Sequence, residues 1–320
     1  ADILMATDPD ADRFASAVKD ENGKMQLITG NQMGALFTDY ICLTAKEFGV
    51  MPAKPAIVRS IVTSHLCDRI AKGYGVESFE CLTGFKWICN KADEITKQGY
   101  HYIYGFEESY GYLSGSHVRD KDAVNASLLI CQMAQYYKRR GMSLVEAMRA
   151  LYQEYGFYRN KTLSLSYPGA DGSVRMRDIM QSLRTNAFSE LGGCTVERVV
   201  DYAGGVNGLP AANVVEFGLA GENKLIVRPS GTEPKIKFYI NAVILNALSL
   251  DEAKKTADTS KKTLIDFYRE LPEGQEGIDL GLYYLSYLDD ACKKVGVKFE
   301  SLVSQFTASD LTVINLIFNF

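Results

Sequence analysis

The fold class is decided by residues 56–108, which read AIVRSIVTSHLCDRIAKGYGVESFECLTGFKWICNKADEITKQGYHYIYGFEE. Apolar runs alternate in this stretch with segments of helical periodicity. We predict strands over 56–64, 76–83 and 100–108, with helices over 65–75 and 85–99 between them. Strands that alternate with helices through short connections indicate a layered α/β domain.

The flanking segments first extend this pattern and then change it. Upstream, we predict a buried strand over 1–7, a hairpin over 14–29 that turns at Asn22-Gly23, and a helix from Gly30. Downstream, we predict helices over 121–140 and 143–155. Beyond these, the predicted order is a strand (161–169), a helix (173–188), four strands (195–202, 213–219, 223–230, 234–244) and a helix (250–271). Runs of strands flanked by helices indicate an α+β unit.

We therefore expect layered α/β units with mixed sheets, followed by an α+β C-terminal unit and a helical tail. The expected boundaries are 1–48, 49–156, 157–271 and 272–320, with a linker containing Gly49, Pro52 and Pro55. The tail has helical periodicity over 278–306 and ends on the apolar run LTVINLIFNF. We interpret it as packing on the preceding unit, with a protein interface as the alternative.

Composition excludes several classes of protein. The 320 residues are 47% hydrophobic and 23% charged, with a net charge of −4, which argues against a nucleic-acid surface. No apolar run approaches the roughly 20 residues that span a bilayer, and no signal peptide is visible. The seven scattered cysteines indicate reduced thiols in a cytoplasmic protein. The chain begins without Met on a strand, so we expect it to be a piece of a longer protein.

Three aspartates follow the first predicted strand in TDPDADR: Asp8, Asp10 and Asp12. A calcium loop of the EF-hand type would need Gly at the position of Arg13 and Glu at that of Lys19, so this interpretation fails. A compact set of oxygen ligands in a tight loop suits Mg²⁺. Arg13 is placed to meet a phosphate, and the alternative is a solvated acidic turn.

A second polar loop follows the predicted strand at 100–108 and reads GFEESYGYLSGSHVRDKD over 105–122. Glu107, Glu108 and Ser109 offer the carboxylates and the hydroxyl that sugar hydroxyls require. His117 and Lys121 add positive groups nearby. The alternative is a hydrated turn that ends in a helix cap.

A third loop, VRPSGTEPK over 227–235, joins two predicted strands. Arg228 can grip a phosphate, Ser230 and Thr232 offer hydroxyls, and Gly231 lets backbone N–H groups converge on an anion. The alternative is a turn that merely connects strands. A weaker motif, LTGFKWI, places Gly84 in a turn and Lys86 within reach of an anion, while we expect Trp87 in the core.

In this order, TDPDADR, GFEESYG and RPSGTEP resemble the metal, sugar and phosphate loops of the α-D-phosphohexomutase family, over residues 1–271. The resemblance is strongest to the branch of phosphoglucomutases and phosphopentomutases. It implies four domains around a cleft, of which 1–48 would be the end of the second, 49–156 the third and 157–271 the fourth. It implies Mg²⁺ as cofactor and a sugar bisphosphate as intermediate.

The resemblance also implies roles for single residues. Asp8, Asp10 and Asp12 would hold Mg²⁺, with Arg13 beside the transferred phosphoryl group. Lys121 and His117 would lie near the reacting groups. The substrate would be bound by the remaining loop residues: Gly84, Lys86, Glu107, Ser109, Arg228, Ser230, Gly231 and Thr232. The expected reaction interconverts sugar 1-phosphate and sugar 6-phosphate, or the 5-phosphate of a pentose, through a phosphoserine.

Two departures from the family pattern change this expectation. The family's Ser-His-Asn-type loop is missing, and TSHL at 63–66 falls elsewhere, so we do not assign Ser64 as the nucleophile. We therefore expect this chain alone to be inactive and to depend on the missing N-terminal domains of the same protein. The tail from 272 has no counterpart in the family.

Two other functions remain open. The chain is a sugar-phosphate-binding module without catalysis if its natural form lacks the serine loop. An apolar strand that ends in Asp-x-Asp also resembles haloacid-dehalogenase-type phosphatases, but Asp12 and Arg13 depart from their motif. Which sugar is bound is not decided by these residues.

Overall fold

The computed structural model describes residues 2–231, 233–245, 298–305 and 312–319. The first sheet is antiparallel, in the order β1 (Ile3–Thr7), β2 (Phe14–Lys19) and β3 (Met25–Ile28). The predicted turn is confirmed, because Gly23 between β2 and β3 has a φ of +76°. The expectation of a buried first strand is wrong: β1 pairs only with β2 in the described part of the chain, and Leu4 and Met5 are half exposed.

The second sheet is mixed, with the order β5-β4-β6-β7. Its strands are β4 (Pro55–Ser60), β5 (Glu77–Cys81), β6 (His101–Glu107) and β7 (Gly111–Ser114). β4 runs parallel to β5 and β6, whereas β7 returns antiparallel to β6. The predicted α/β alternation is confirmed, although β4 ends at Ser60 instead of 64.

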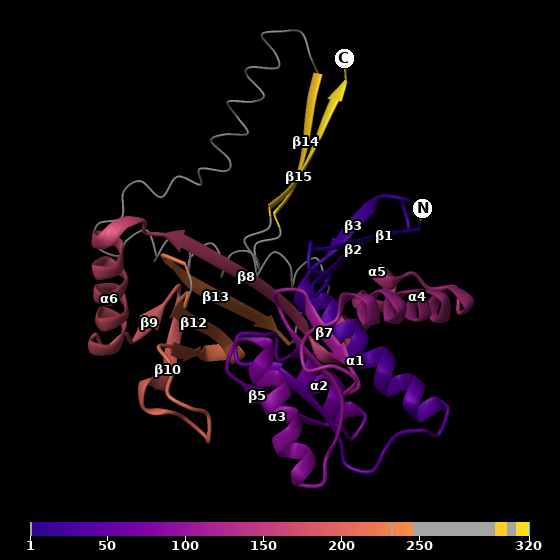
Figure 1. Cartoon of the computed structure of the whole chain (residues 1–320), viewed down its shortest axis with the longest axis horizontal. Coiled ribbons are helices and arrows are strands. Elements are labelled where there is room, and N and C mark those ends of the chain that lie inside the picture. Colours follow the sequence, from indigo (N-terminus) through magenta and orange to yellow (C-terminus); the bar gives the residue numbers. More distant parts are fainter. Residues whose placement is uncertain (1, 232, 246–297, 306–311, 320) are drawn as a thin grey trace.

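Helices cover both faces of this mixed sheet (Figure 1). They are α1 (Gly30–Glu47), α2 (Leu66–Gly73), α3 (Phe85–Lys97), α4 (Ala123–Arg139) and α5 (Leu144–Tyr155). α3 packs on the face that carries Ala56 and Val58, and the other four pack on the face that carries Ile57 and Tyr104. The chain crosses from β4 to β5 in one direction and from β5 to β6 in the other, so right-handed crossovers place α2 and α3 on opposite faces.

The third sheet has six antiparallel strands in the order β8-β13-β12-β11-β10-β9. They are β8 (Phe157–Ser166), β9 (Glu190–Leu191), β10 (Cys194–Asp201), β11 (Val215–Leu219), β12 (Asn223–Pro229) and β13 (Lys235–Ile244). Short 3₁₀ turns, η1 (Tyr202–Gly204) and η2 (Ala220–Glu222), follow β10 and β11. The helix α6 (Gly169–Thr185) packs on one face, against Leu225, Val227 and Phe238. The predicted α+β unit is confirmed for the described residues.

The opposite face of the third sheet packs against the ends of the mixed sheet's strands. Ile61 and Val62, which directly follow β4, share one buried cluster with Ile226 of β12 and Tyr239 of β13. Side chains on a strand alternate between its two faces. Leu225 and Val227 of β12 therefore contact α6, whereas Ile226 contacts the ends of the mixed sheet's strands. This contact places the β12–β13 connection beside the carboxyl ends of β4 and β6.

The expected helical tail is wrong for the residues that are described there. They form an antiparallel hairpin of β14 (Lys298–Gln305) and β15 (Thr312–Asn319). The sequence TVINLIFN of β15 is rich in residues that favour strands, and its backbone groups form hydrogen bonds with a second strand. This pairing outweighs the helical periodicity of the segment. The predicted helix over 250–271 lies outside the described residues.

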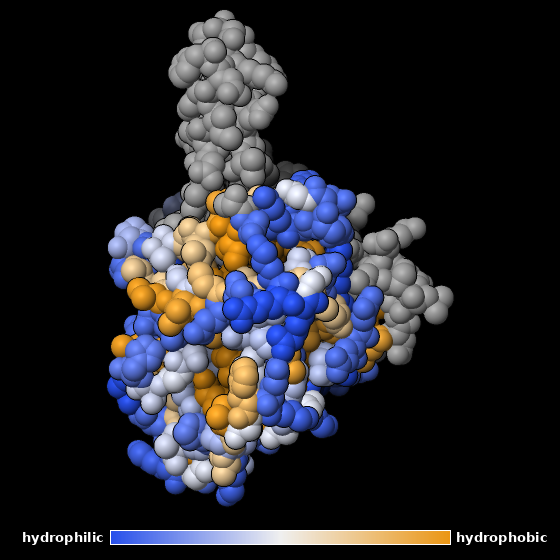
Figure 2. Space-filling view, turned by 90° about the vertical axis from the view of Figure 1, so that its right-hand side faces the viewer, coloured by the Kyte–Doolittle hydropathy of each residue, from blue (hydrophilic) through white to orange (hydrophobic). Residues whose placement is uncertain are grey.

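The surface mixes apolar and hydrophilic residues on the face that Figure 2 shows. α1 and α4 border a shallow groove of about 540 Å³ that Phe48, Leu129 and Tyr136 line. No helix among the described residues is long and apolar enough to cross a membrane. The six cysteines in the described part of the chain are free thiols, as predicted; Cys292 lies outside it.

Candidate active site

The aspartate loop joins β1 to β2 and is shaped by its own hydrogen bonds. Asp8 Oδ1 accepts from the backbone N–H groups of Asp12 at 3.2 Å and Arg13 at 3.0 Å. Ala11 has a φ of +55°, which lets the chain double back. One carboxylate oxygen each of Asp8, Asp10 and Asp12 lies within 4.8 Å of the others. The structure therefore brings together the three predicted metal ligands.

The charges in this loop are only partly balanced. Burial alone would raise the pKa of Asp8, but the hydrogen bonds from Arg13 and Asp12 outweigh it and the pKa is lowered. Burial raises the pKa of Asp12, although Lys121 Nζ contacts its Oδ2 at 2.5 Å. Among the described residues, Asp12 Oδ1 is buried without a hydrogen-bond partner, and Arg13 Nε, which also donates no hydrogen bond, lies 3.9 Å from Asp8 Oδ2 as an ion pair. A hard cation fits a site of three converging carboxylates with an unused buried oxygen.

The turn between β6 and β7 lies directly against the aspartate loop. Phe14 N donates to Tyr110 O at 2.9 Å, and Arg13 forms a bridge with Gly111. Ala123 N, at the start of α4, donates to Ala11 O at 3.2 Å. These backbone contacts join the predicted metal and sugar loops, which are about 100 residues apart in the sequence, into one site.

Glu107, the predicted sugar ligand, ends β6 and is 7% exposed. Burial raises its pKa, while Lys121 and a hydrogen bond from Ser109 act in the opposite direction. Gly111 makes this arrangement possible, because a Cβ there would lie 2.8 Å from Lys121 Cδ and 2.9 Å from Glu107 Cγ. Lys121 thus reaches both Asp12 and the vicinity of Glu107. Burial would lower the pKa of Lys121, but the contact with Asp12 raises it.

His117 lies farther out in the same loop. Its Nε2 is 3.0 Å from Asp122 Oδ2, and its side chain is half exposed. Asp122 also caps α4 by accepting from the backbone N–H groups of Val124 and Asn125. In the described structure, His117 therefore contacts a helix cap, and its predicted place near the reacting groups stays a prediction.

The predicted phosphate loop joins β12 to β13. Ser230 N donates to Lys235 O at 2.7 Å, and Ser230 Oγ accepts from Glu233 N at 3.3 Å. A Cβ at Gly231 would meet no other described residue within 4 Å. Burial raises the pKa of Tyr239 on β13, and the nearby Arg228 side chain acts in the opposite direction. Thr232 lies outside the described residues.

The weaker motif lies at the start of α3. Gly84 has a φ of +112° and is the residue before the helix, as a turn there requires. Lys86 is exposed, with its Nζ 5.4 Å from the centre of the Trp87 ring. Trp87, predicted in the core, is partly buried and packs against the margins of two buried clusters. Among the described residues, no contact joins Lys86 to Glu107 or Arg228.

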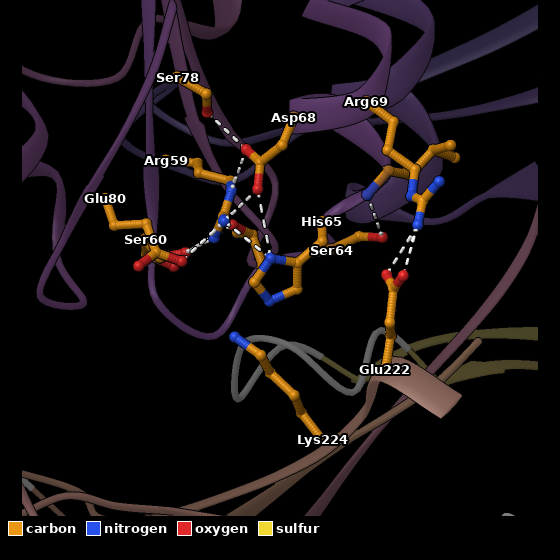
Figure 3. A network of polar contacts seen from close by, with 12 residues as sticks. Arg59, Ser60, Ser64, His65, Asp68, Arg69, Ser78, Glu80, Glu222 and Lys224 are labelled. Carbon is orange, nitrogen blue, oxygen red and sulfur yellow. Dashed lines mark hydrogen bonds and ion pairs between the residues drawn. The ribbon is translucent and has the colours of Figure 1, made fainter. Parts of the chain in front are cut away.

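Sequence reasoning missed a buried polar network at the carboxyl end of β4 (Figure 3). Arg59 is 2% exposed and forms ion pairs with Asp68 of α2 and Glu80 of β5, the latter at 2.7 Å. It also donates to the Ser60 carbonyl at 3.2 Å and lies 3.0 Å from His65 Nδ1. No local pattern marks Arg59, because its partners come from three different elements.

This network orients the residues that follow β4. Ser60 Oγ donates to Glu108 Oε2 at 3.3 Å, and Thr63 Oγ1 donates to the Ser60 carbonyl at 2.6 Å. On the other side, Arg69 of α2 forms an ion pair with Glu222 beside β12, at 2.7 Å. The sugar loop and the third sheet are thus both attached to the segment that Arg59 anchors, and Figure 3 shows the contact with the third sheet between Arg69 and Glu222.

Two sequence profiles match the chain. Residues 29–155 match the family described as phosphoglucomutase/phosphomannomutase, alpha/beta/alpha domain III. Residues 248–320 match a family of unknown function.

Curated relatives match most of the chain. A phosphoglucomutase of Staphylococcus haemolyticus is 34% identical over 257 residues, which are 77% of this chain and 46% of the relative. A phosphoglucomutase of Staphylococcus aureus is 36% identical over 255 residues, or 75% of this chain and 45% of the relative. The chain therefore spans about half the length of the curated relatives that it matches.

Solved structures show the same fold. Phosphoglucomutase pp63/parafusin of Paramecium, in its open form, aligns with a TM-score of 0.57 and 18% identity over 84% of this chain and 46% of its own. A phosphoglucomutase/phosphomannomutase family protein of Burkholderia thailandensis aligns with a TM-score of 0.52 and 17% identity over 84% of this chain and 48% of its own. These structures show the shared fold, and the sequence matches show that the chain belongs to the α-D-phosphohexomutase family.

Proposed function

We propose that this chain carries the metal, sugar and phosphate loops of a Mg²⁺-dependent phosphosugar mutase. The observation that supports this most strongly is the convergence of the aspartate loop, Glu107 and Lys121 through direct backbone contacts. Bound Mg²⁺ would offset negative charge on the transferring phosphoryl group, and Asp8, Asp10 and Asp12 would hold it.

The remaining residues bind and orient the sugar phosphate. Glu107 and Ser109 accept and donate hydrogen bonds to sugar hydroxyls, and Arg228 with Ser230 and Gly231 holds the phosphate that is not transferred. The ammonium group of Lys121, which contacts Asp12 and lies near Glu107, offsets negative charge beside the bound sugar phosphate. Because the sugar is held at both ends, either of its phosphates can be presented in line to the reacting group.

We propose further that turnover needs a phosphoserine segment outside these 320 residues. The 1–48, 49–156 and 157–271 units then act as parts of a four-domain enzyme in the cytoplasm, and the sugar bisphosphate is its intermediate. Without that segment, the chain binds sugar phosphate and does not convert glucose 1-phosphate into glucose 6-phosphate in a coupled assay.

Calorimetric titration of glucose 1-phosphate in the presence of Mg²⁺ tests the binding site. We expect Arg228→Ala to abolish binding, since the phosphate loses its bidentate partner. Arg177→Ala is the matched control, because Arg177 is exposed on α6, on the opposite face of the third sheet, and its loss should leave affinity unchanged. Equal binding by wild type and Arg228→Ala would refute the assignment of the phosphate loop.

A further inference from the structure

Glu108 is a buried carboxylate that the proposed reaction does not use. It follows Glu107 in the β6–β7 turn and is 8% exposed. Its carboxylate accepts hydrogen bonds from Ser60 Oγ at 3.3 Å and from its own backbone N–H. Within the described part of the chain, no Lys or Arg nitrogen lies within the 4.0 Å of an ion pair with it. Such a group is costly to keep charged unless more distant cations compensate.

Two cations of the third sheet lie on the sheet face that packs against Ile61 and Val62, the residues directly after Ser60. They are Arg228 of β12, at the start of the phosphate loop, and Lys237 of β13, which is paired with Arg228 across the two strands. The other groups around Glu108 are one carboxylate and several uncharged groups: Glu107 at the end of β6, Ser60 at the end of β4, Tyr112 on β7, Tyr239 on β13 and the amino end of α1 at Gly30.

The backbone that carries Glu108 packs closely against the start of α1. A Cβ at Gly30 would lie 1.9 Å from the Glu108 carbonyl oxygen, so the turn sits directly on the start of α1. Tyr112 Oη donates to the Gly30 carbonyl at 3.5 Å on the same side. A carboxylate held in this position responds to a change in nearby charge by changing its protonation state.

The balance of charges at this position is close. Burial and the charge of Glu107 raise the pKa of Glu108, Arg228 and Lys237 act in the opposite direction, and together they place it at about 7. A phosphate bound by Arg228 brings negative charge close to Glu108. It also neutralises Arg228, the cation that favours the ionised form of Glu108. The charged carboxylate then becomes less favourable than it is in the free protein.

We propose that Glu108 is the built-in counter-anion of the phosphate loop, facing Arg228 and Lys237 in the free protein and taking up a proton from solvent when a phosphate or sulfate group binds there. This inference rests on the proposed function, because it needs the anion to bind at Arg228. No bond in the ligand forms or breaks in this step. Binding is thereby coupled to pH, and affinity falls as pH rises.

Calorimetry with inorganic sulfate tests the coupling, because sulfate does not itself titrate near neutral pH. Titrations in two buffers of different ionisation enthalpy measure the number of protons taken up on binding. We expect wild-type affinity to fall by up to about tenfold between about pH 6 and pH 9, for a pKa that the bound ion raises by about one unit. Glu108→Gln should change by less than about twofold and take up almost no proton, because its amide cannot ionise.

Two further variants keep the test decisive. Glu77→Gln removes an exposed carboxylate at the amino end of β5, at the far end of the parallel strands, and should keep the wild-type pH dependence. Ser60→Ala removes the side-chain hydrogen bond that favours the ionised form of Glu108, so the pH midpoint should move upward. This variant retains Glu108, so it tests the inference even where Glu108→Gln does not fold.

The outcomes separate this inference from the proposed function. Equal proton uptake and equal pH dependence in wild type and Glu108→Gln, with binding still lost in Arg228→Ala, would overturn the inference alone. An unchanged pH midpoint in Ser60→Ala would also contradict it. If wild type binds neither sulfate nor glucose 1-phosphate at about pH 6, or if Arg228→Ala binds as well as wild type, the proposed function itself fails.

Discussion

Replacing Arg59 by Met should destabilise the mixed sheet more than any surface change. Arg59 is 2% exposed and lies between the carboxylates of Asp68 and Glu80, so the substitution leaves two partly buried negative charges without their cation. Breaking a buried ion pair by removing one partner costs about 3–5 kcal/mol. Because folded domains are stable by only about 5–15 kcal/mol, the loss should be plain in a denaturant titration.

The single tryptophan provides the assay. Trp87 packs between the mixed and third sheets, so its fluorescence in a urea titration follows the packing that Arg59 supports. Arg69→Met is the matched control on the neighbouring helix. Arg69 forms an ion pair with Glu222 that is exposed on both sides, and such pairs contribute only about 0–1 kcal/mol.

The pH dependence of this loss is a stricter test. Burial would raise the pKa of Asp68, but Arg59 and His65 outweigh it and hold the pKa well below its usual range. The stability that Asp68 contributes is therefore present above its unfolded pKa of about 4 and is lost as pH falls below it. In Arg59→Met the carboxylates can accept protons, so the destabilisation should shrink from pH 7 toward pH 4. A loss below about 1 kcal/mol at pH 7, or one that does not change with pH, would refute the assigned role of Arg59.

Three other changes test the site and the core. Asp10→Asn should weaken Mg²⁺ binding by at least about tenfold in a metal titration, since a neutral amide replaces one of three converging charges, whereas unchanged affinity would place the metal elsewhere. Gly111→Ala should lower glucose 1-phosphate affinity and cost about 1–3 kcal/mol in unfolding, because the new Cβ displaces Lys121 and Glu107, and a neutral result would contradict their close packing. Burial raises the pKa of Asp39, although hydrogen bonds from Tyr74 and Tyr137 act in the opposite direction. The stability that protonated Asp39 contributes is therefore present below its unfolded pKa and is lost as pH rises through its folded pKa. In Asp39→Asn, the free energy of unfolding should therefore fall less steeply above about pH 4 than in wild type. Thermal unfolding at several pH values measures this, and equal slopes in the two proteins would contradict the role of Asp39.

Local patterns determined much of this protein. The periodicity of residues 56–155 predicted the alternation of strands and helices, because side chains repeat every two residues on a strand and every 3.6 on a helix. The three acidic or polar loops were recognisable because each follows a strand and gathers residues that suit one kind of ligand. Asp8, Asp10 and Asp12 meet within one turn, so their spacing alone predicted that they lie together.

Contacts between distant segments decided the rest. The first strand was predicted to be buried, but burial depends on what covers a strand, and β2 is the only strand paired with it among the described residues. The described tail residues are strands because pairing between two segments outweighs the local tendency of either.

The charges of the site also depend on the tertiary structure. Arg59 looks like any residue of a strand until the fold brings Asp68 and Glu80 to it. In the same way, Arg228 affects the pKa of Glu108 only because Ile61 and Val62 pack against the third sheet. The sequence by itself determined which chemical groups are present, whereas which charges meet, and whether water reaches them, follows from the packing of elements far apart along the chain.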